Sequence, residues 1–353
     1  MSKIYLDDMI LTKDLPTTAG SKMLEGYVSL FDATVAQKLA EAGHEIAGKA
    51  AVGEFAIDLV GETSYTGGEN AAQLLKSGAA DAVLCLDVNG APRRIAAQNG
   101  LVFIKPTYGT VSRFGTVSVA CSGECVGVMA RSVETCAAIL SVIAGHDDKD
   151  GTMQKESVCR EALEADTNAP FKTVAPESLL RDGTDMLAAA GAAWNILMCA
   201  ELCNNVSRYD GIKYGYRTKN YKTIEELYTG SRTEAFGDLL KAAILYGSDV
   251  LSSKNYMAKY DKAMRVRRVI REYLDGILEE CDAIVMPACS KEAYEASELK
   301  NGSYAVFAEN RYTALAQLTG LPAVVVNGKQ LIGKPFSDGK LLAIAAMMEK
   351  EGK

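Results

Sequence analysis

The run Lys105-Pro106-Thr107-Tyr108-Gly109-Thr110-Val111-Ser112-Arg113-Phe114-Gly115 decides the fold of this 353-residue chain. It follows the apolar segment Leu101–Ile104, which we predict to be a buried strand that is stopped by Pro106, because proline has no N–H to donate to a sheet. Proline and glycine fix the path of the chain through this block. We therefore expect the block, with Lys105, to be structural and to pack at the centre of the protein.

Further apolar segments lie on both sides of this block. Asp81–Asp87 (DAVLCLD) is a nearly continuous apolar run, which is typical of a strand buried on both faces, and Pro92 lies where a following helix can begin. Strand patterns from both ends of the chain are separated by helical patterns, and this order predicts an α/β protein. We predict helices over Asp32–Ala42, Asn70–Lys76, Ser132–Ala144, Met186–Val206, Asn255–Glu280 and from Ser337, and strands over Glu45–Ala47, Ala283–Met286 and Ala323–Val326.

The composition is that of an ordinary globular protein: 48% of the residues are hydrophobic, 24% are charged and the formal net charge is −7. The first two values exclude long disorder. The acidic balance argues against non-specific binding to nucleic acid. Nine cysteines without a Cys-x-x-Cys pair, and only two histidines, His44 and His146, favour reduced thiols and argue against a zinc site.

The sequence gives no sign of export or of insertion into a membrane. Charged residues at Lys3, Asp7 and Asp8 stand where a signal peptide needs an apolar run. The longest uncharged helical stretch, Met186–Ala200, is shorter than the roughly 17–25 residues that cross a bilayer. We therefore expect a soluble cytoplasmic protein, with the polar and poorly patterned stretch Asp147–Asp185 on its surface.

Sequence motifs of one known family follow one another in order along the chain. With these motifs the chain resembles the amidase signature family from Ile4 to about Glu349, and within it the glutamine-hydrolysing A subunits of tRNA-dependent amidotransferases. Besides the Lys105–Gly115 block, the matching runs are Thr17-Thr18-Ala19-Gly20-Ser21-Lys22-Met23-Leu24, Asp32-Ala33-Thr34-Val35, Ala42-Gly43-His44-Glu45-Ile46, Ala144-Gly145-His146-Asp147, Ser207-Arg208-Tyr209-Asp210-Gly211, Tyr214-Gly215-Tyr216-Arg217, Arg232-Thr233-Glu234-Ala235-Phe236-Gly237, Gly320-Leu321-Pro322-Ala323 and Ile332-Gly333-Lys334-Pro335-Phe336.

The resemblance implies a fold: a central mixed β-sheet covered by helices on both faces. Residues 1–353 would form a single amidase-like domain, in which 145–186 is a compressed, poorly patterned segment, and the strands Asp81–Leu86 and Leu101–Ile104 would be adjacent. It also implies a chemistry, amide hydrolysis without a cofactor. One serine attacks the carbonyl, a second serine relays the proton, a buried lysine is the base, and backbone N–H groups hold the oxyanion.

This chain departs from the family at each of these catalytic positions. Counting without gaps from the neighbouring motifs places Asp7 at the position of the lysine base and Ala91 at that of the nucleophilic serine. Glu69 falls at the position of the relay serine, in the stretch where the alignment is loosest. The backbone that holds the oxyanion corresponds to Asn89, Gly90 and Ala91, of which Gly90 is kept.

The loop before the relay position is also shortened. We therefore expect the site to be opened to water, with Asp7 at least partly exposed and close to Ala91 and Asp87. Four carboxylates, Asp7, Asp8, Glu69 and Asp87, can in principle cluster and attract a hard cation. Solvated or hydrogen-bonded carboxylates are the simpler expectation, so no metal site is predicted.

The pocket that holds the amino acid in the glutaminase subunits differs as well. The family's binding arginine corresponds to Ala243, its binding aspartate falls at about Asn310, and an aromatic wall residue maps to Trp194, the only tryptophan of the chain. The family's N-terminal helical segment has no counterpart before Met1. A natural start at this methionine and a trimmed chain both fit that difference.

Two hypotheses about function follow. In the first, the protein is a catalytically degenerate, non-catalytic binding or partner subunit, which works beside an active amidotransferase or amidase or as a homo-oligomer. Its small-molecule ligand is undetermined. We expect no binding to a membrane, and none to nucleic acid by this chain on its own. In the second, it is an active amidase or amidotransferase A subunit with a site rebuilt around Asp7, Glu69, Asp87 and the thiols of Cys121 and Cys125. We favour the first, because losing a nucleophile and base costs a hydrolase on the order of 10⁶ in kcat.

Overall fold

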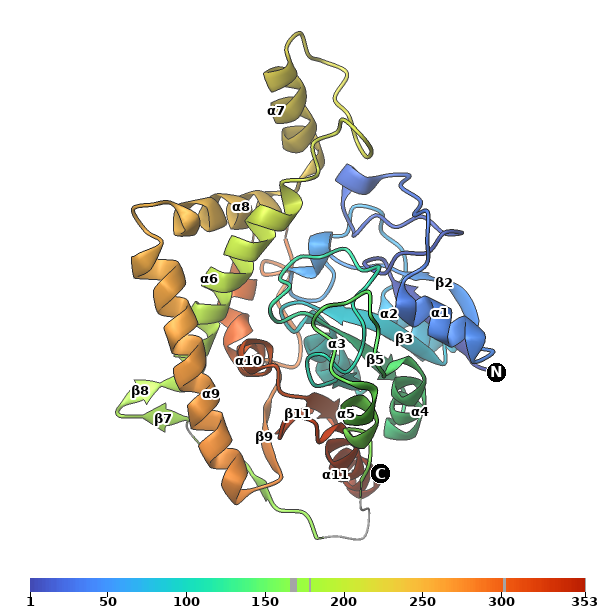
Figure 1. Ribbon diagram of the computed structural model, residues 1–353, viewed down its shortest axis with the longest axis vertical. Coiled ribbons are helices and arrows are strands. Elements are labelled where there is room, and N and C mark those ends of the chain that lie inside the picture. Colours follow the sequence, from blue (N-terminus) through green and yellow to red (C-terminus); the bar gives the residue numbers. More distant parts are fainter. Residues whose placement is uncertain (166–169, 178, 301–302, 353) are drawn as a thin grey trace.

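The computed structural model of the protein describes residues 1–165, 170–177, 179–300 and 303–352. Within them, nine strands form one mixed sheet in the order β2-β1-β3-β5-β4-β10-β11-β9-β6, and β7 and β8 form a separate hairpin (Figure 1). The strands are β1 (Lys3–Asp7), β2 (Glu45–Ala50), β3 (Ala82–Asp87), β4 (Val102–Lys105), β5 (Cys125–Ala130), β6 (Thr173–Val174), β7 (Leu180–Arg181), β8 (Thr184–Asp185), β9 (Ala283–Pro287), β10 (Ala323–Val326) and β11 (Lys329–Gly333).

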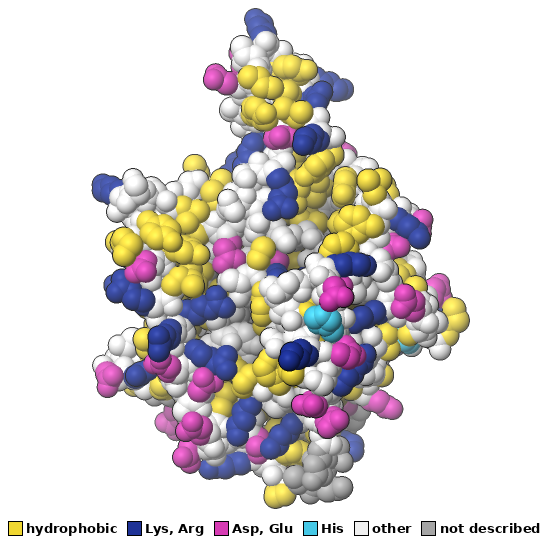
Figure 2. Space-filling view, in the orientation of Figure 1, with side chains coloured by type: hydrophobic (Ala, Val, Ile, Leu, Met, Phe, Trp, Pro, Cys, Tyr) yellow, Lys and Arg dark blue, Asp and Glu magenta, His cyan; other side chains and the backbone are white. Residues whose placement is uncertain are grey.

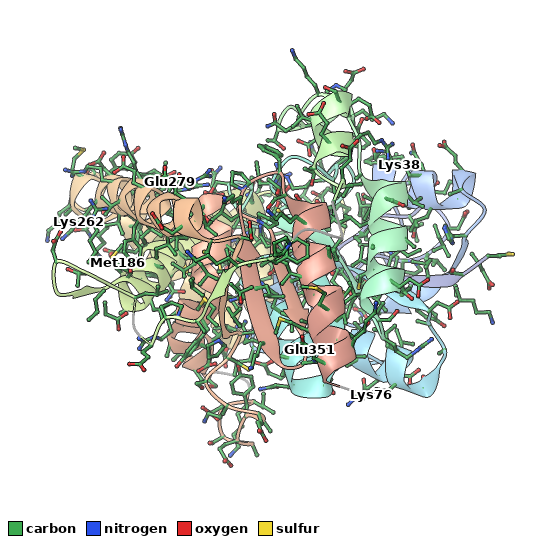
Figure 3. All side chains as sticks on the ribbon, turned by 90° about the horizontal axis from the view of Figure 1, so that it is seen from below. Lys38, Lys76, Met186, Lys262, Glu279 and Glu351 are labelled. Carbon is green, nitrogen blue, oxygen red and sulfur yellow. The ribbon has the colours of Figure 1, made fainter. Side chains whose placement is uncertain are left out.

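Helices cover both faces of the sheet, as the predicted fold class requires. One face packs against α2 and α3, and the other against α4 and α11. At right angles to the first view, α6 and α9 (Met186, Lys262 and Glu279 are labelled) lie at one end of the molecule, and Lys38 and Lys76 of α1 and α2 lie at the other (Figure 3). The helices are α1 (Thr34–Glu41), α2 (Ala71–Ser77), α3 (Ala91–Asn99), α4 (Val133–Ile143), α5 (Glu156–Glu161), α6 (Met186–Val206), α7 (Ile224–Ala235), α8 (Asp238–Leu251), α9 (Lys262–Glu280), α10 (Ala305–Thr319) and α11 (Asp338–Glu351).

Three parallel strands place the candidate site. β1 pairs in parallel with β2 on one side and with β3 on the other, so that Leu6 lies opposite both Lys49 and Leu84. Their carboxyl ends, at Ala50, Asp7 and Asp87, therefore meet at one edge of the sheet. In open α/β sheets this edge is where ligands bind.

The predicted adjacency of Asp81–Leu86 and Leu101–Ile104 is wrong. Strand β5 lies between β3 and β4 and pairs antiparallel with both, with Val128 opposite Leu84 on one side and Ile104 on the other. The Ser- and Gly-containing sequence around Cys125 hides this strand. Gly127 is needed there because a side chain would collide with the ring of Phe103, since a Cβ at that position would lie 2.5 Å from it.

The sequence predicted that the uncharged stretch Met186–Ala200 is too short to span a membrane, but helix α6 extends beyond this stretch. It runs for 21 residues, and by length and composition alone it is able to span a membrane. The uncharged stretch ends before Glu201, which lies within the helix and whose carboxylate accepts a hydrogen bond from the backbone N–H of Ser122 (2.9 Å). In the structure 56% of its most apolar window is buried inside the protein, where α6 packs against α8 and α10, as expected for a core helix.

The segment 145–186 contains more structure than its sequence pattern predicts. It includes α5, the β7–β8 hairpin and β6, which extends the sheet beside β9. Residues 166–169 and 178 of this segment lie outside the described residues. The prediction that 1–353 forms a single domain stays a prediction, although strands from both ends of the chain share one sheet.

We predict that Gly90→Ala strongly destabilises the protein. Gly90 precedes α3 with φ of +95°, and a Cβ there would lie 2.3 Å from the Cβ of Thr313 on α10. We expect a loss of about 3 kcal/mol or more in the free energy of unfolding, from backbone strain plus overpacking. Denaturant unfolding is the measurement, and Gly78→Ala is the control, because Gly78 has φ of +78° but open space around it. Equal losses in the two variants would contradict the close packing of α3 on α10.

Candidate active site

Asp7 ends β1 and has only 2% of its surface exposed. Its carboxylate accepts two backbone hydrogen bonds, from the N–H of Met9 to Oδ1 (3.1 Å) and from the N–H of Leu86 to Oδ2 (2.6 Å). The first closes the turn after β1, and the second ties that turn to β3. Because both partners are donors, the backbone around Asp7 suits a carboxylate and does not suit an ammonium group.

Burial shifts the pKa values of Asp7, Asp8 and Lys49. Burial raises the pKa of Asp7 to about 7, because desolvation of the charged form outweighs the two hydrogen bonds and the attraction of Lys49. Burial also raises the pKa of Asp8, although Thr18 donates to it through both its N–H and its hydroxyl. Desolvation lowers the pKa of Lys49 to about 8, against the attraction of the two aspartates. Burial therefore brings the pKa values of Asp7 and Lys49 close to each other.

Ala91 is the first residue of α3, directly after Gly90. The N–H groups that correspond to the family's oxyanion donors already have acceptors: Gly90 N–H donates to Asp87 Oδ1 (2.7 Å), and Ala91 N–H donates to Asn89 Oδ1 (3.1 Å). Asn89 is itself held by donating to the carbonyl oxygens of Ile57 (2.7 Å) and Asp58 (3.1 Å). Both N–H groups are therefore already bound to side-chain oxygens of the protein itself, and the assignment of an oxyanion hole to this backbone stays a prediction.

Two fully buried arginines on α3 support this turn. Arg93 forms an ion pair with Asp87 (2.8 Å) and also donates to Gln317 and to Gln330 (2.6 Å). Arg94 donates instead to backbone oxygens, among them those of Leu59 (2.9 Å), Asp58 (3.0 Å) and Asn89 (3.1 Å). Buried guanidinium groups need such complete sets of acceptors.

A small cavity lies between these groups, at the carboxyl ends of β1, β2 and β3. Its volume is about 30 Å³, enough for two or three water-sized groups, since roughly 10–15 Å³ holds one. Asp7 and Ala91 both line it, so the structure brings together two of the predicted catalytic positions. The rest of the lining is Ala50, Ala51, Val52, Gly53, Ala56, Asp58, Gly61, Ala71, Cys85, Leu86, Pro92 and Ile95.

The expectation that Asp7 is partly exposed in a site opened to water is wrong. The loop over residues 51–61 and the start of α2 close over the carboxyl end of β1, and Ala56, Asp58 and Ala71 are all buried. The site is therefore covered, and small side chains such as Ala56 and Ala71 let the loop and the helix pack closely over it.

Glu69 is exposed and is not among the described residues that line the cavity. Its carbonyl oxygen accepts the N–H of Ala51 (2.9 Å), which continues the edge of β2. The next residue, Asn70, is the N-cap of α2 and forms a capping box with Gln73. The Glu69 side chain is therefore exposed directly before a helix, and its correspondence to the relay serine stays a prediction.

The three residues predicted for the amino-acid pocket are fully buried in the helical half of the molecule. Trp194 lies on α6 beside Gly123, Ala243 lies on α8, and Asn310 on α10 hydrogen-bonds Asn195 of α6 (2.8 Å). Among the described residues lining the Asp7 cavity, none of the three occurs. Their role in binding stays a prediction.

The thiols are poor candidates for a replacement nucleophile. Burial raises the pKa of Cys85, which lines the cavity, and of Cys125, although Lys105 acts in the opposite direction on the latter. Cys121 is half-buried and lies near Asn205, whose amide is 3.3 Å from its Sγ. A reactive thiol needs an electropositive partner and access, and burial removes the access from both Cys85 and Cys125.

The suggested acidic cluster does not form. Asp7 and Asp8 are neighbours, but Asp87 is paired with Arg93 and Glu69 is at the surface. Within the described part of the chain, no group of three or more histidine, cysteine or carboxylate side chains is placed to hold a metal ion.

Sequence reasoning missed Asp58 and the two arginines. Asp58 lines the cavity and accepts hydrogen bonds from Gly61 N–H (3.0 Å) and from Thr63 (2.9 Å), which shapes the covering loop. One signal was present for the arginines: Arg93 and Arg94 are the only charged residues in the short stretch between two buried strands. Adjacent charges in such a place predict buried ion pairing.

Comparison with known proteins places this sheet and site in a family. The family model described as Amidase matches residues 4–78, 71–175 and 185–342, which is more than half of the chain. The protein belongs to the amidase signature family.

Its relatives include the A subunits of glutamyl-tRNA(Gln) amidotransferases. The one from Maridesulfovibrio salexigens is 33% identical, with 98% of this chain and 83% of the relative covered, and the one from Lachnoclostridium phytofermentans is 34% identical, with 98% and 82% covered. The first alignment spans 411 positions, more than the 353 residues of this chain, so the relative has segments that this chain lacks.

Solved structures show the same architecture. The A subunit of glutamyl-tRNA(Gln) amidotransferase from Thermotoga maritima superposes with a TM-score of 0.78 at 28% identity, covering 99% of this chain and 83% of that one. A component of a vestigial complex related to an s-triazine catabolic enzyme gives the same TM-score at 20% identity, covering 99% and 84%, and at this identity it shows the fold alone.

We predict that Asp7→Asn removes part of the pH dependence of stability. The folded-state pKa of Asp7, about 7, lies above the ordinary value of 3.8, so the folded protein holds this proton more tightly than the unfolded chain. Stability must therefore fall as the pH rises from about 4 to 7 and stay low above that. Relative to wild type, the variant should gain about 2–3 kcal/mol in the free energy of unfolding between pH 5 and pH 8.

Urea unfolding at both pH values measures this difference. Asp8, Lys49 and Cys85 also face Asp7, but they are present in both proteins and largely cancel. Asp14→Asn, at an exposed position, is the control and should show no such gain. An Asp7→Asn difference that is flat with pH would contradict a protonated, desolvated Asp7.

We also predict that Asp7→Lys combined with Ala91→Ser does not create a glutaminase. A lysine ammonium at position 7 would face the donor groups of Met9 and Leu86 and would be buried without its acceptors. The relay position, Glu69, remains at the surface. Ammonia release from glutamine, measured on protein whose fold is verified by circular dichroism, should stay at background. Measurable hydrolysis would show that the rest of the site is still organised for catalysis.

Proposed function

We propose that this protein is an amidase-fold binding or partner subunit that has lost the Ser-Ser-Lys machinery. The observation that carries the proposal is the pairing of Asp7 and Ala91 in one closed cavity, where the resemblance places a lysine base and a nucleophilic serine. A carboxyl with a pKa of about 7 and a methyl group supply neither an activated hydroxyl nor its base.

Two further features support the loss of hydrolysis. The N–H groups of Gly90 and Ala91 already bind side-chain oxygens, so a tetrahedral intermediate would have to displace these internal hydrogen bonds. The cavity, of about 30 Å³, also leaves little room beside Asp7 for the carboxamide of glutamine.

A protein partner is part of this proposal. The relatives are named as A subunits of an amidotransferase, and this makes another amidotransferase-type chain a reasonable class of partner. Figure 2 shows apolar side chains gathered on the projecting arm that contains α7 and at the corner where α8 leads toward α9. Ile224 on the arm is 56% exposed, and Leu245 and Met257 at the corner are 71% and 63% exposed, so both regions offer apolar contact area. A second copy of this chain is the alternative occupant.

The redox state of the thiols supports a cytoplasmic location. All nine cysteines are free in the structure, and most are buried, which fits a reducing compartment.

We predict no amide hydrolysis by the purified protein. Ammonia release from glutamine and from simple amides should stay at background, because both the nucleophile and the base are missing. The control is Cys121→Ala, which removes the half-buried thiol. Turnover that persists in pure wild-type protein and disappears in this variant would overturn the proposal in favour of a rebuilt, cysteine-dependent site.

A further inference from the structure

We propose that the cavity between Asp7 and Ala91 binds a small primary ammonium ion of the methylammonium class, with Asp7 as its counter-ion. This inference rests on the proposed function, because it assigns a ligand to the former catalytic site. It stands on three observations: the volume of the cavity, the apolar nature of its wall, and the buried Asp7 carboxyl, both of whose oxygens have unused acceptor capacity.

The carboxyl supplies the recognition of charge. Each carboxylate oxygen has two acceptor lone pairs, and within the described residues each oxygen of Asp7 accepts one backbone N–H, from Met9 or from Leu86. One acceptor site on each oxygen is therefore left. An ammonium group has N–H donors for these sites and neutralises a charge that burial makes costly.

The wall of the cavity supplies the recognition of size and shape. Small apolar side chains surround the space, and Val52, Ala71 and Ile95 are among them. About 30 Å³ holds two or three water-sized groups, which corresponds to a nitrogen and one or two carbons. A methyl or ethyl group against this wall is favourable, whereas a longer or branched amine does not fit.

The same wall disfavours a bare metal ion. Besides Asp7, the lining contains one other carboxylate, Asp58, and its oxygens already accept hydrogen bonds from Gly61 and Thr63. Ca²⁺ takes six to eight oxygen ligands and Mg²⁺ about six, which apolar side chains do not provide. An alkylammonium ion needs only hydrogen-bond acceptors on one side.

Access to the cavity lies at its rim. Ala51, Val52 and Gly61 line it and are only half-buried, whereas Asp7, Ala91 and Asp58 are buried. A ligand can therefore enter between the chain at 51–52 and Gly61, with its ammonium group leading toward Asp7.

Binding should be coupled to the proton of Asp7. Because its pKa lies near 7, Asp7 is mostly protonated at pH 6 and mostly ionised at pH 8, whereas methylammonium stays charged throughout. Asp8, Lys49 and Cys85 also face Asp7, and Asp58 shares the cavity. The affinity should rise about tenfold from pH 6 to pH 8, and about one proton should be released per ligand bound at pH 6.

Calorimetric titration of the full chain with methylammonium chloride tests the site, at constant ionic strength set with sodium chloride. We expect saturable binding to one site, a Tm raised by about 2 °C at ten times the Kd, and no binding of tetramethylammonium, which is too large and has no N–H. Buffers of different ionisation enthalpy report the released proton.

Two variants separate charge from volume. Asp7→Asn should abolish binding by removing the counter-ion, and Ala91→Val should abolish it by filling the cavity while leaving the Asp7-dependent pH profile of stability in place. Asp14→Asn, at the surface, should bind as wild type does. Methylammonium binding that survives in Asp7→Asn, that tetramethylammonium matches, or that is absent from folded wild-type protein would overturn the site.

Failure of this inference and failure of the proposed function give different results. Amide hydrolysis together with methylammonium binding would overturn the loss of catalysis and keep the ammonium site. No hydrolysis and no binding would overturn the ammonium site and keep the loss of catalysis.

Discussion

The ion pair between Arg93 and Asp87 holds together parts of the chain that are far apart in sequence. Asp87 ends β3, and Arg93 lies in the first turn of α3, but the same guanidinium also donates to the carbonyl oxygen of Thr313 on α10 and to Gln330 on β11. Gln317 closes the network by donating to the carbonyl oxygen of Asp87 (3.0 Å). Removing one partner of such a fully buried pair leaves a charge without compensation, which costs about 3–5 kcal/mol. The turn Asp87–Ala91, and with it one wall of the cavity, depends on this network.

The site combines the family's fold with an unusual set of side chains. The parallel strands, the turn after β3 and the start of α3 at Ala91 remain, and together they still form a cavity at the carboxyl edge of the sheet. Within that frame position 7 carries a carboxyl group, and its two oxygens accept the N–H groups of Met9 and Leu86. If this backbone had presented carbonyl oxygens, as a buried cation needs, Asp7 would have had no N–H donors. The backbone around position 7 is therefore consistent with its present residue.

Much of the fold could be predicted from local sequence, because the signals are local. The apolar run Asp81–Asp87, Pro92 in the first turn of α3 and the Ser132 cap of α4 all depend on residues within a few positions. The strand β5 could not be recognised in the same way, since Gly127 is explained by the carbonyl oxygen of Ile104 and the ring of Phe103 on the neighbouring strand. The positions of Asp7 and Ala91 in one site were predictable from motif spacing. The burial of Asp7 was not, because the loop over 51–61 that covers it comes from another part of the sequence.

The order of strands in the sheet has a consequence for synthesis on the ribosome. The edge of β4 is completed by β10, whose Ala323 pairs with Lys105, so more than two hundred residues must be added before that edge is covered. At roughly 5–20 residues per second, the nascent chain carries an open, apolar strand edge for roughly 10–40 s. Over the same interval the Arg93 side chain lacks its hydrogen-bond acceptors on α10 and β11, because these elements have not yet been synthesised. Exposed edges of this kind pair readily with other chains, so this protein should be most prone to aggregate, and most in need of a chaperone, before the β10 segment has been made.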